Sequence, residues 1–306
     1  MSKARGSWRD ELAKVRVRLA EHGVANAQHE ARWMVEVASG LDAAALAADD
    51  SPAGAHALQH VWAMCDRRVA GEPLQYVLGS WSFRDLDLMV DPRVLVPRPE
   101  TEWLVEVALR EMERRHARRG RSVPELDPAT SLLVADLGTG SGAIALALAA
   151  ELPDAEVWAT DVSDDALAVA RANVAGQAAA RVRLQRGSWF EALPPELRGR
   201  FDLVVSNPPY LADDERASLA SEVVDHEPAT ALFAGPTGLE AIDLLIDGAP
   251  GWLRAGGLFV CELAPHQGEH ARARAARPAY ARAEVHDDLA GRARVLVAQT
   301  PAASDR

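Results

Sequence analysis

The stretch from Phe201 to Tyr210, which reads Phe-Asp-Leu-Val-Val-Ser-Asn-Pro-Pro-Tyr, constrains the fold of this chain more than any other. Its short run of Leu and Val has no polar alternation, which is typical of a strand buried on both faces of a sheet. Pro208 and Pro209 end the strand, because each fixes φ and lacks an N–H. Asn207 precedes a proline and is pushed toward an extended conformation. The sequence therefore predicts a stiff turn at the carboxyl end of a central strand, where α/β sheets bind ligands.

This turn offers the acceptors that a planar NH2 group requires. The side chain of Asn207 and the carbonyl of Pro208 can each accept a hydrogen bond, and the ring of Tyr210 can lie on the face of the group. A proline-stopped strand followed by an ordinary loop is the competing interpretation. The motif therefore needs a partner elsewhere in the chain.

A strand-turn-helix pattern upstream supplies such a partner. The apolar segment 132–137 is followed by the loop 138–142, Gly-Thr-Gly-Ser-Gly, and then by a helical run of Ala, Ile and Leu. Glycines in such a loop let the backbone approach a ligand closely. The loop also fits the fingerprint of NAD-binding domains, with Asp161 as the acid about twenty residues further on. Taken alone, this segment leaves a dinucleotide-binding domain as a competitor.

Two further predicted strands decide between the cofactors. The segment 156–161 ends in Asp161, whose carboxylate can bind ribose hydroxyls in either cofactor. A third strand at 180–184 is followed by Trp189, and the strand that ends at Asn207 is the fourth. In this order, the glycine loop, the acid and Asn-Pro-Pro-Tyr resemble the S-adenosylmethionine-dependent amino-methyltransferases. A dehydrogenase gives no reason for Asn-Pro-Pro-Tyr at that place.

The composition indicates what the chain does not bind. It has 306 residues, 48% of them hydrophobic, and a formal net charge of −12, which argues against a surface that grips nucleic acid phosphates non-specifically. The two cysteines lie far apart, no histidine spacing requires a metal, and no apolar run reaches membrane-spanning length. The first ten residues lack the apolar core of a secretion signal. We therefore expect a cytoplasmic monomer with no metal, no stably bound nucleic acid and no membrane contact.

Three parts of the chain are predicted. Residues 1–78 contain three amphipathic helical patterns, each ended by a glycine, and we expect a small helical domain that docks the substrate or only stabilises the fold. Alternating apolar residues predict a β-hairpin linker at 79–97. Residues 98–306 hold the motifs described above and form the predicted catalytic domain.

The resemblance becomes specific between residues 71 and 102. Gly-x-Pro-x-x-Tyr at 71–76 and Val-Pro-Arg-Pro-Glu-Thr-Glu at 96–102, followed by the cofactor motifs and Asn-Pro-Pro-Tyr, resemble the HemK/PrmC family, the peptide chain release factor N5-glutamine methyltransferases. Adenine methyltransferases share Asn-Pro-Pro-Tyr, and the Pro-Arg-Pro-Glu-Thr-Glu segment separates this family from them and from ribosomal-protein glutamine methyltransferases. Further similar stretches are 227–239, 256–258 with Glu262 and Gln267, and 288–292.

The resemblance implies an α/β fold of class I S-adenosylmethionine methyltransferases, a Rossmann-like seven-stranded and mostly parallel sheet with a small N-terminal helical domain joined by a β-hairpin. It implies methyl transfer from S-adenosyl-L-methionine to the side-chain amide nitrogen (N5) of the glutamine in the Gly-Gly-Gln motif of class I peptide chain release factors, which supports translation termination. Three alternatives stay open: a nucleic-acid adenine-N6 methyltransferase, a ribosomal-protein glutamine methyltransferase, and a catalytically idle module that recognises translation factors.

The family's residue roles carry over only to the matching motifs. For the cofactor they imply Gly138, Thr139, Gly140, Ser141 and Gly142 around the methionine moiety, Asp161 on the ribose, Trp189 at the adenine, and Asn207. For the substrate they imply Asn207, Pro208, Pro209 and Tyr210, among which Asn207, Pro208 and Tyr210 are the expected catalytic residues. Competing interpretations make Asp161 a helix cap, Trp189 a core residue, and Asp136 only a hydrogen-bonding residue at a strand end.

Overall fold

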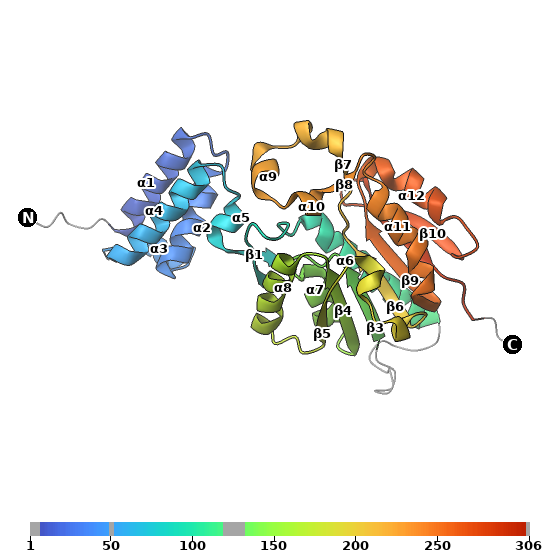
Figure 1. Ribbon diagram of the computed structural model, residues 1–306. Helices are drawn as coiled ribbons and strands as arrows, with labels where there is room; N and C mark the ends of the chain where they lie inside the picture. Colours follow the sequence, from blue (N-terminus) through green and yellow to red (C-terminus); the bar gives the residue numbers. More distant parts are fainter. Residues whose placement is uncertain (1–6, 49–51, 119–131, 304–306) are drawn as a thin grey trace, which may run out of the picture. The chain divides into compact units, whose positions relative to one another are not determined.

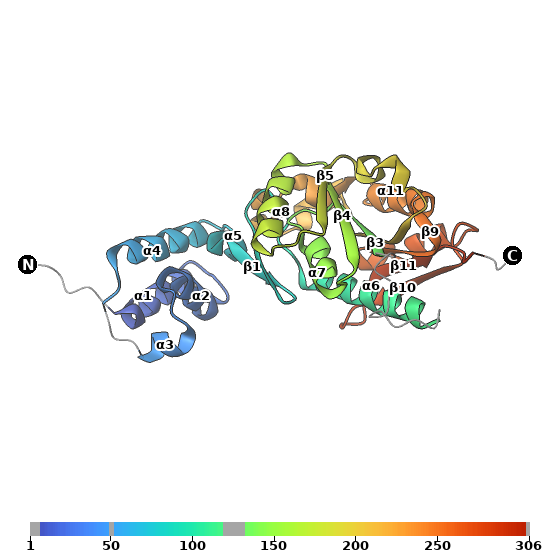
Figure 2. The same cartoon turned by 90° about the horizontal axis from the view of Figure 1, so that it is seen from below.

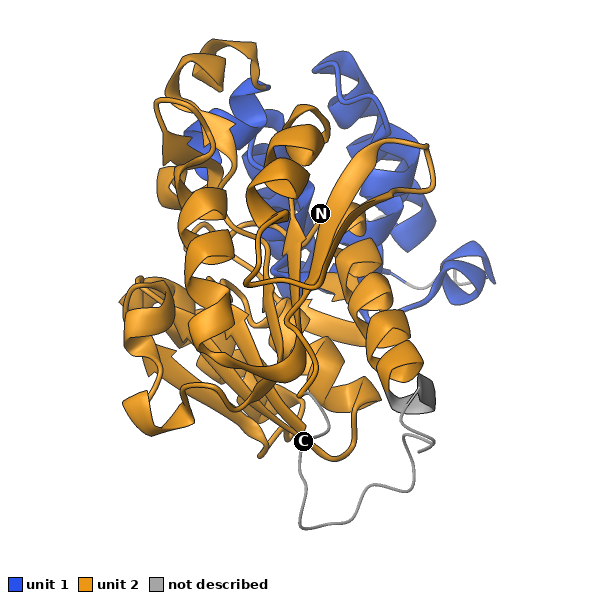
Figure 3. Cartoon of the chain, turned by 90° about the vertical axis from the view of Figure 1, so that its right-hand side faces the viewer, with its two compact units in different colours: residues 1–80, 220–226 blue, residues 81–219, 227–306 orange. Residues whose placement is uncertain are grey.

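The computed structural model describes residues 7–48, 52–118 and 132–303 (Figure 1). They form two compact units, which Figure 3 colours separately. The first unit holds the described residues up to Ser80 together with Ala220–His226, and the second holds Trp81–Leu219 and the residues from Glu227 onward. A short segment from the second half of the chain therefore belongs to the first unit.

The first unit is a bundle of short helices. A capping box begins its first helix, because Ser7 Oγ accepts a hydrogen bond from Asp10 N and Asp10 Oδ2 accepts one from Ser7 N. Its core consists of apolar side chains at helical spacing: Val15, Leu19, Met34, Val35, Val61, Met64 and Cys65. The helices are α1 (Trp8–Glu21), α2 (Ala27–Ser39), α3 (Ala43–Ala48), α4 (Ala55–Val69), α5 (Leu74–Leu78) and α9 (Ser221–His226).

The second unit is built around a seven-stranded sheet with the order β10-β11-β9-β6-β3-β4-β5. Five neighbouring strands are parallel, and β11 runs antiparallel to both β9 and β10. This is the mostly parallel α/β sheet that the resemblance implied. Its strands are β3 (Leu132–Leu137), β4 (Ala155–Asp161), β5 (Val182–Arg186), β6 (Phe201–Ser206), β9 (Leu253–Glu262), β10 (Arg282–Asp287) and β11 (Ala293–Gln299).

Smaller elements complete this unit. The predicted hairpin is present as β1 (Ser80–Phe83) and β2 (Leu86–Met89), and β7 (Leu211–Ala212) pairs with β8 (Phe233–Gly235). The helices are α6 (Pro99–Arg118), α7 (Ala143–Glu151), α8 (Asp164–Gly176), α10 (Ala229–Leu232), α11 (Glu240–Gly248) and α12 (Gly268–Ala275). Helix α11 ends at Gly248, where a short 3-10 turn containing Pro250 follows.

Helices cover both faces of the sheet (Figures 1 and 2). Because side chains alternate along a strand, Val134 packs in one core cluster with residues of α6 and α7, and Ala135 packs in the other with residues of α11 and α12. All six residues of β6 are buried. The expectation that the strand before Asn207 is covered on both faces is therefore confirmed.

The strand order reverses between β3 and β6. From β3 the chain adds β4 and β5 on one side and then returns to place β6 on the other side of β3. In open α/β sheets such a reversal opens a crevice at the carboxyl ends of the two strands. The glycine loop follows β3 and the Asn-Pro-Pro-Tyr turn follows β6, so the topology brings the two motifs together.

Candidate active site

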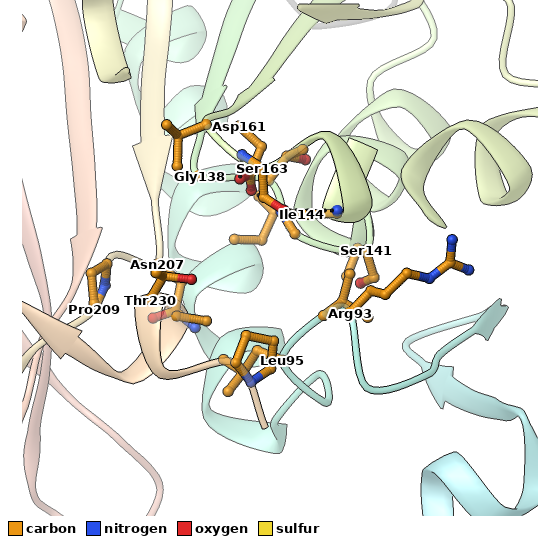
Figure 4. Close-up of a pocket in the computed structure, with 18 of the residues that line it drawn as sticks. Arg93, Leu95, Gly138, Ser141, Ile144, Asp161, Ser163, Asn207, Pro209 and Thr230 are labelled. Atoms are coloured by element: carbon orange, nitrogen blue, oxygen red, sulfur yellow. Dashed lines mark hydrogen bonds between the residues drawn. The ribbon is translucent and has the colours of Figure 1, made fainter. Parts of the chain in front are cut away.

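A pocket at the carboxyl ends of the central strands gathers most of the predicted site residues (Figure 4). Its cavity volume is about 150 Å³, and it is open to solvent. Its lining includes Gly138, Thr139, Gly140, Ser141, Asp161, Trp189, Asn207 and Pro209. The predicted site residues Gly142, Pro208 and Tyr210 are not among the described residues that line the pocket.

The glycine loop is fixed by the backbone of β4 and by one buried carboxyl. Gly138 N and Thr139 N both donate to Thr160 O, at 2.9 and 2.8 Å. Asp136 Oδ2 accepts hydrogen bonds from Thr139 Oγ1 at 2.6 Å and from Ala145 N at 3.1 Å. Burial raises the pKa of Asp136 to about 7, although these two bonds lower it. Asp136 thus has the strand-end hydrogen-bonding role and holds the loop from behind.

Trp189 lies against this loop. A Cβ added at Gly138, where φ is +76°, would meet the Trp189 ring at 3.3 Å. Trp189 itself has φ +45°, a left-handed conformation that is strained for a bulky residue and is found more often at functional sites. Its ring lines the pocket and also packs against the core cluster of α11 and α12. The two interpretations of this residue therefore do not exclude each other.

Asp161, the last residue of β4, joins two loops across the pocket. Its Oδ2 accepts a hydrogen bond from Gly140 N at 2.9 Å, and its Oδ1 accepts one from Ser163 N at 2.9 Å. Burial raises the pKa of this carboxyl, while the two backbone bonds lower it. Each oxygen keeps a further lone pair for a ribose hydroxyl. The side-chain cap of α8 is Ser163, whose Oγ accepts from Ala166 N at 3.1 Å.

Asn207 lies in the wall of the pocket at the end of a chain of hydrogen bonds. Its Nδ2 donates to Thr101 Oγ1 at 2.9 Å, and Thr101 Oγ1 donates to Glu262 Oε2 at 2.8 Å. Thr101 lies in the first turn of α6 and is 4% exposed, and Glu262 ends β9 and is fully buried. The sequence signalled these two residues only through the Pro-Arg-Pro-Glu-Thr-Glu motif and the similar stretch around Glu262.

Glu262 lies in a strongly desolvated environment. Burial raises its pKa to about 7, and the hydrogen bond from Thr101 and the positive charge of Arg294 act in the opposite direction. Glu100 raises the pKa as well, and a hydrogen bond with the Tyr210 side chain lowers it. Burial of the charged form of this carboxyl is therefore unfavourable, and its hydrogen bonds offset this only in part.

The Asn-Pro-Pro-Tyr turn is held from behind. Gln267 Nε2 donates to Tyr210 O at 2.8 Å and to Gly238 O at 3.0 Å. A Cβ at Gly238 would lie 2.7 Å from Tyr210 O, so only glycine fits there. The Tyr210 ring packs against the core cluster of α11 and α12, and burial raises the pKa of its hydroxyl. Pro208 is buried within this turn.

An ion pair joins two segments of the pocket wall. Arg98 Nη2 lies 2.5 Å from Glu227 Oε1, and the Glu227 side chain is 1% exposed. Their neighbours Pro97 and Pro228 both line the pocket. The pair therefore ties the start of α6 to the segment before α10, and it adds a second long-range contact to the wall that carries Asn207.

Figure 4 shows Gly138, Asp161 and Ser163 together in one part of the pocket and Asn207 and Thr230 in another. One part offers backbone and a carboxylate, and the other offers a carboxamide. In the described ranges, no group of histidine, cysteine, aspartate and glutamate side chains is placed to hold a metal ion. Nor do those ranges contain a helix with the length and apolar character needed to cross a bilayer.

Two family models match the chain. The one described as "Methyltransferase small domain" matches residues 123–235, and "PrmC N-terminal domain" matches residues 10–79. Three relatives are each named "Release factor glutamine methyltransferase". The protein of Bordetella pertussis is 42% identical over 87% of this chain and 92% of its own. That of Moorella thermoacetica is 41% identical over 95% and 97%, and that of Geobacter sulfurreducens is 41% identical over 82% of each chain.

A solved structure shares the fold at low sequence identity. The catalytic domain of hMettl16, in complex with the MAT2A 3′UTR hairpin 6, superposes with a TM-score of 0.53 at 16% identity, over 81% of this chain and 82% of that one. At this identity the likeness concerns the arrangement of strands and helices.

Proposed function

This chain belongs to the release factor glutamine methyltransferase family, and on that premise we propose that it transfers a methyl group from S-adenosyl-L-methionine to the N5 nitrogen of the glutamine in the Gly-Gly-Gln motif of class I release factors. One observation carries the assignment of the site: Asn207 and the glycine loop line the same pocket. A cofactor on the loop and an amide at Asn207 are therefore within one cavity.

The residues present fit S-adenosylmethionine. The loop 138–142 exposes backbone where side chains would block a ligand, and the Cβ contact at Gly138 shows how close Trp189 lies to it. Asp161 has lone pairs left for ribose hydroxyls, and Trp189 offers a flat ring for adenine. We propose that Gly138, Thr139, Gly140 and Ser141 hold the methionine part, with Gly142 as the N-cap of α7 behind them.

The protein's contribution to the reaction is to position a weak nucleophile. When bound, S-adenosylmethionine supplies an electrophilic methyl carbon and a thioether that leaves without charge. An amide nitrogen attacks poorly because its lone pair is delocalised into the carbonyl. We propose that Asn207 Oδ1 and the Pro208 carbonyl each accept one hydrogen of the glutamine side-chain NH2 group. Pro209 and Tyr210 shape the turn, and the Tyr210 ring packs on the face of this amide.

These hydrogen bonds favour the positive charge that develops on nitrogen as the N–C bond forms and the S–C bond breaks, with the bonding pair leaving on sulfur. The amide has no need of a general base before methyl transfer, because the methylated nitrogen is strongly acidic and loses its extra proton afterwards. Polarisation and alignment by Asn207 are therefore the expected sources of rate enhancement.

The test is a comparison of acceptors. The full chain is incubated with methyl-labelled S-adenosylmethionine and, separately, a class I release factor, ribosomal proteins and DNA. We expect label on the Gly-Gly-Gln glutamine of the release factor and none on a release factor in which that glutamine is replaced by alanine. Label on DNA or on ribosomal proteins alone would favour the adenine or ribosomal-protein alternatives, and no label on any acceptor would favour the idle module.

The remaining parts of the proposal concern partners. We propose that residues 1–78 dock the release factor, that residues 79–97 link them to the catalytic domain 98–306, and that the protein acts as a cytoplasmic monomer without stably bound nucleic acid. The net charge of −12 supports the absence of stably bound nucleic acid. Cross-linking to the release factor tests the docking: we expect cross-links in residues 1–78, and cross-links confined to the rest of the chain would contradict it.

A further inference from the structure

We propose that Thr101 and Glu262 are positioning residues that hold the Asn207 carboxamide in the single orientation in which its oxygen faces the acceptor nitrogen. This inference rests on the proposed function, since it concerns how Asn207 receives the glutamine amide. The geometry behind it is the pair of hydrogen bonds from Asn207 Nδ2 to Thr101 Oγ1 and from Thr101 Oγ1 to Glu262 Oε2, at 2.9 and 2.8 Å.

The direction of this chain follows from the chemistry of its last member. A carboxylate oxygen only accepts, so the single proton of the Thr101 hydroxyl is used on Glu262. The hydroxyl then has only lone pairs left for Asn207, and the group that meets them must be a donor, Nδ2. Protonation of Glu262 on Oε1 does not change this role, because Oε2 still accepts the hydrogen bond from Thr101. The opposite end of the carboxamide, Oδ1, is left for the pocket.

The alternative orientation would be harmful to the reaction. The oxygen and nitrogen of a carboxamide are nearly the same size, so packing alone does not distinguish the two flips. A flipped Asn207 would turn its NH2 group toward the NH2 group of the acceptor, which places donor against donor. Without Thr101 and Glu262, part of the enzyme population would present the wrong end of Asn207.

The fold explains why these residues meet. Asn207 follows β6, and β9 pairs with β6 with Ser206 opposite Cys261, so Glu262 lies beside the start of the turn. Thr101 is placed from the other side by the first turn of α6, where its backbone N–H donates to Arg98 O at 3.0 Å. Thr101 and Glu262 are therefore carried by regular elements, and Asn207 directly follows a buried strand, which suits a positioning role.

Glu262 also interacts with Tyr210 and Arg294, but these contacts do not remove the cost of burying its carboxyl. Burial of a carboxyl is unfavourable, and an apolar side chain of similar size would fill the same space at lower cost. The raised pKa of Glu262 reflects that cost. A residue that is expensive to bury and whose oxygen ends a chain at Asn207 is better explained by the orientation of Asn207 than by packing.

The test replaces each member by an apolar residue of similar size and by a conservative partner. Thr101→Val and Glu262→Met break the chain, and we expect each to lower kcat for release factor methylation about 10- to 100-fold, the effect of losing one hydrogen bond in a charge-linked chain. Thr101→Ser and Glu262→Gln keep a donor and an acceptor, and we expect both within about threefold of the parent. The Kd of S-adenosylmethionine, measured by calorimetry, should stay nearly unchanged.

A matched control is Thr300→Val. Thr300 is also buried, and its hydroxyl also accepts from one N–H (Gly257 N, 3.0 Å) and donates to one oxygen (Arg254 O, 2.8 Å), but it lies outside the pocket. We expect Thr300→Val to keep the parent kcat whatever its effect on thermal stability. A Thr101→Val protein with parental kcat, or one whose whole loss lies in cofactor affinity, would overturn the proposal. Should Thr101→Val fail to fold, Glu262→Met decides by the same criteria.

A spectroscopic measurement separates this inference from the proposed function. The side-chain NH2 signals of Asn207 can be assigned in the ¹H–¹⁵N spectrum by their loss in Asn207→Asp. We expect one of its protons to be protected from exchange in the parent and in Thr101→Ser, and both to exchange freely in Thr101→Val. If the parent methylates no release factor but shows this pattern, the function is wrong and the positioning stands. If Thr101→Val leaves the signals unchanged, the positioning is wrong.

Discussion

The cofactor half and the acceptor half of the pocket are built in different ways. In the cofactor half, Thr139 binds Asp136 three residues away, and Gly140 binds Asp161 twenty-one residues away. In the acceptor half, Asn207 binds Thr101 across 106 residues, and Thr101 binds Glu262 across 161. The first half depends on two adjacent strand-loop units, whereas the second forms only when the end of the sheet and the start of α6 are assembled. Substitutions in the cofactor half should therefore lower cofactor affinity, whereas substitutions in the acceptor half should lower turnover.

The largest expected effect lies in the acceptor half. Asn207→Ala removes the acceptor proposed for the glutamine amide, and we expect methyl transfer to fall about 100- to 1,000-fold, as when one preorganised polar group is removed from an active site. The Kd for S-adenosylmethionine should change little. Single-turnover rates with labelled cofactor measure the loss of methyl transfer, and isothermal calorimetry measures the Kd. Methylation at a nearly normal rate would remove Asn207 from its assigned role.

The complementary change lies in the cofactor half. Asp161→Ala removes the acceptor for Gly140 N and Ser163 N as well as the proposed ribose contact, and we expect cofactor affinity to fall about 10- to 100-fold. Asp164→Ala, an exposed acid at the start of α8, is the matched control and should bind the cofactor as the parent does. Calorimetry measures both variants. Equal affinity for Asp161→Ala and the parent would contradict the ribose assignment.

Gly238, behind the Asn-Pro-Pro-Tyr turn, tests through the unfolding free energy how tightly the acceptor half is packed. Gly238→Ala introduces a Cβ 2.7 Å from Tyr210 O at φ +73°, so it combines backbone strain with a clash. Gly291→Ala has nearly the same φ, +74°, but no atom within 4 Å. We expect Gly291→Ala to lose about 1 kcal/mol of unfolding free energy and Gly238→Ala about 2–3 kcal/mol. Urea denaturation measures both, and equal losses would show that the turn yields to the added methyl group.

A further expected effect is a slope of stability with pH. The pKa of Asp136 is about 7 in the folded protein and 3.8 in its ordinary state, so the folded protein binds a proton that the unfolded chain releases between these values. Its stabilising effect is complete below about pH 4 and is lost as pH rises through 7. We expect Asp136→Asn to reduce the fall in unfolding free energy between pH 5 and 8, by at most about 1.4 kcal/mol per pH unit. Denaturation at several pH values checks this, and parallel curves for the two proteins would contradict it.

The difference between local and long-range contacts also explains what the sequence alone can predict. The glycine loop, Asp161 and the strand before Asn207 are local patterns, and the sheet and its strand order follow the pattern that the resemblance implied. The contact of Thr101 with Glu262 joins two residues that no local pattern pairs, and it becomes visible only when β9 lies next to β6. The membership of Ala220–His226 in the first unit is hidden for the same reason, since it depends on contacts with distant residues.

In the proposed reaction, Asn207 holds the acceptor amide beside the cofactor. A crystal structure of the chain with S-adenosylhomocysteine and a glutamine peptide from the release factor motif tests it most directly. We predict that the peptide's amide nitrogen lies within about 3.2 Å of Asn207 Oδ1, with Nδ2 still on Thr101. A peptide amide bound elsewhere, with Asn207 facing only the protein, would contradict the account.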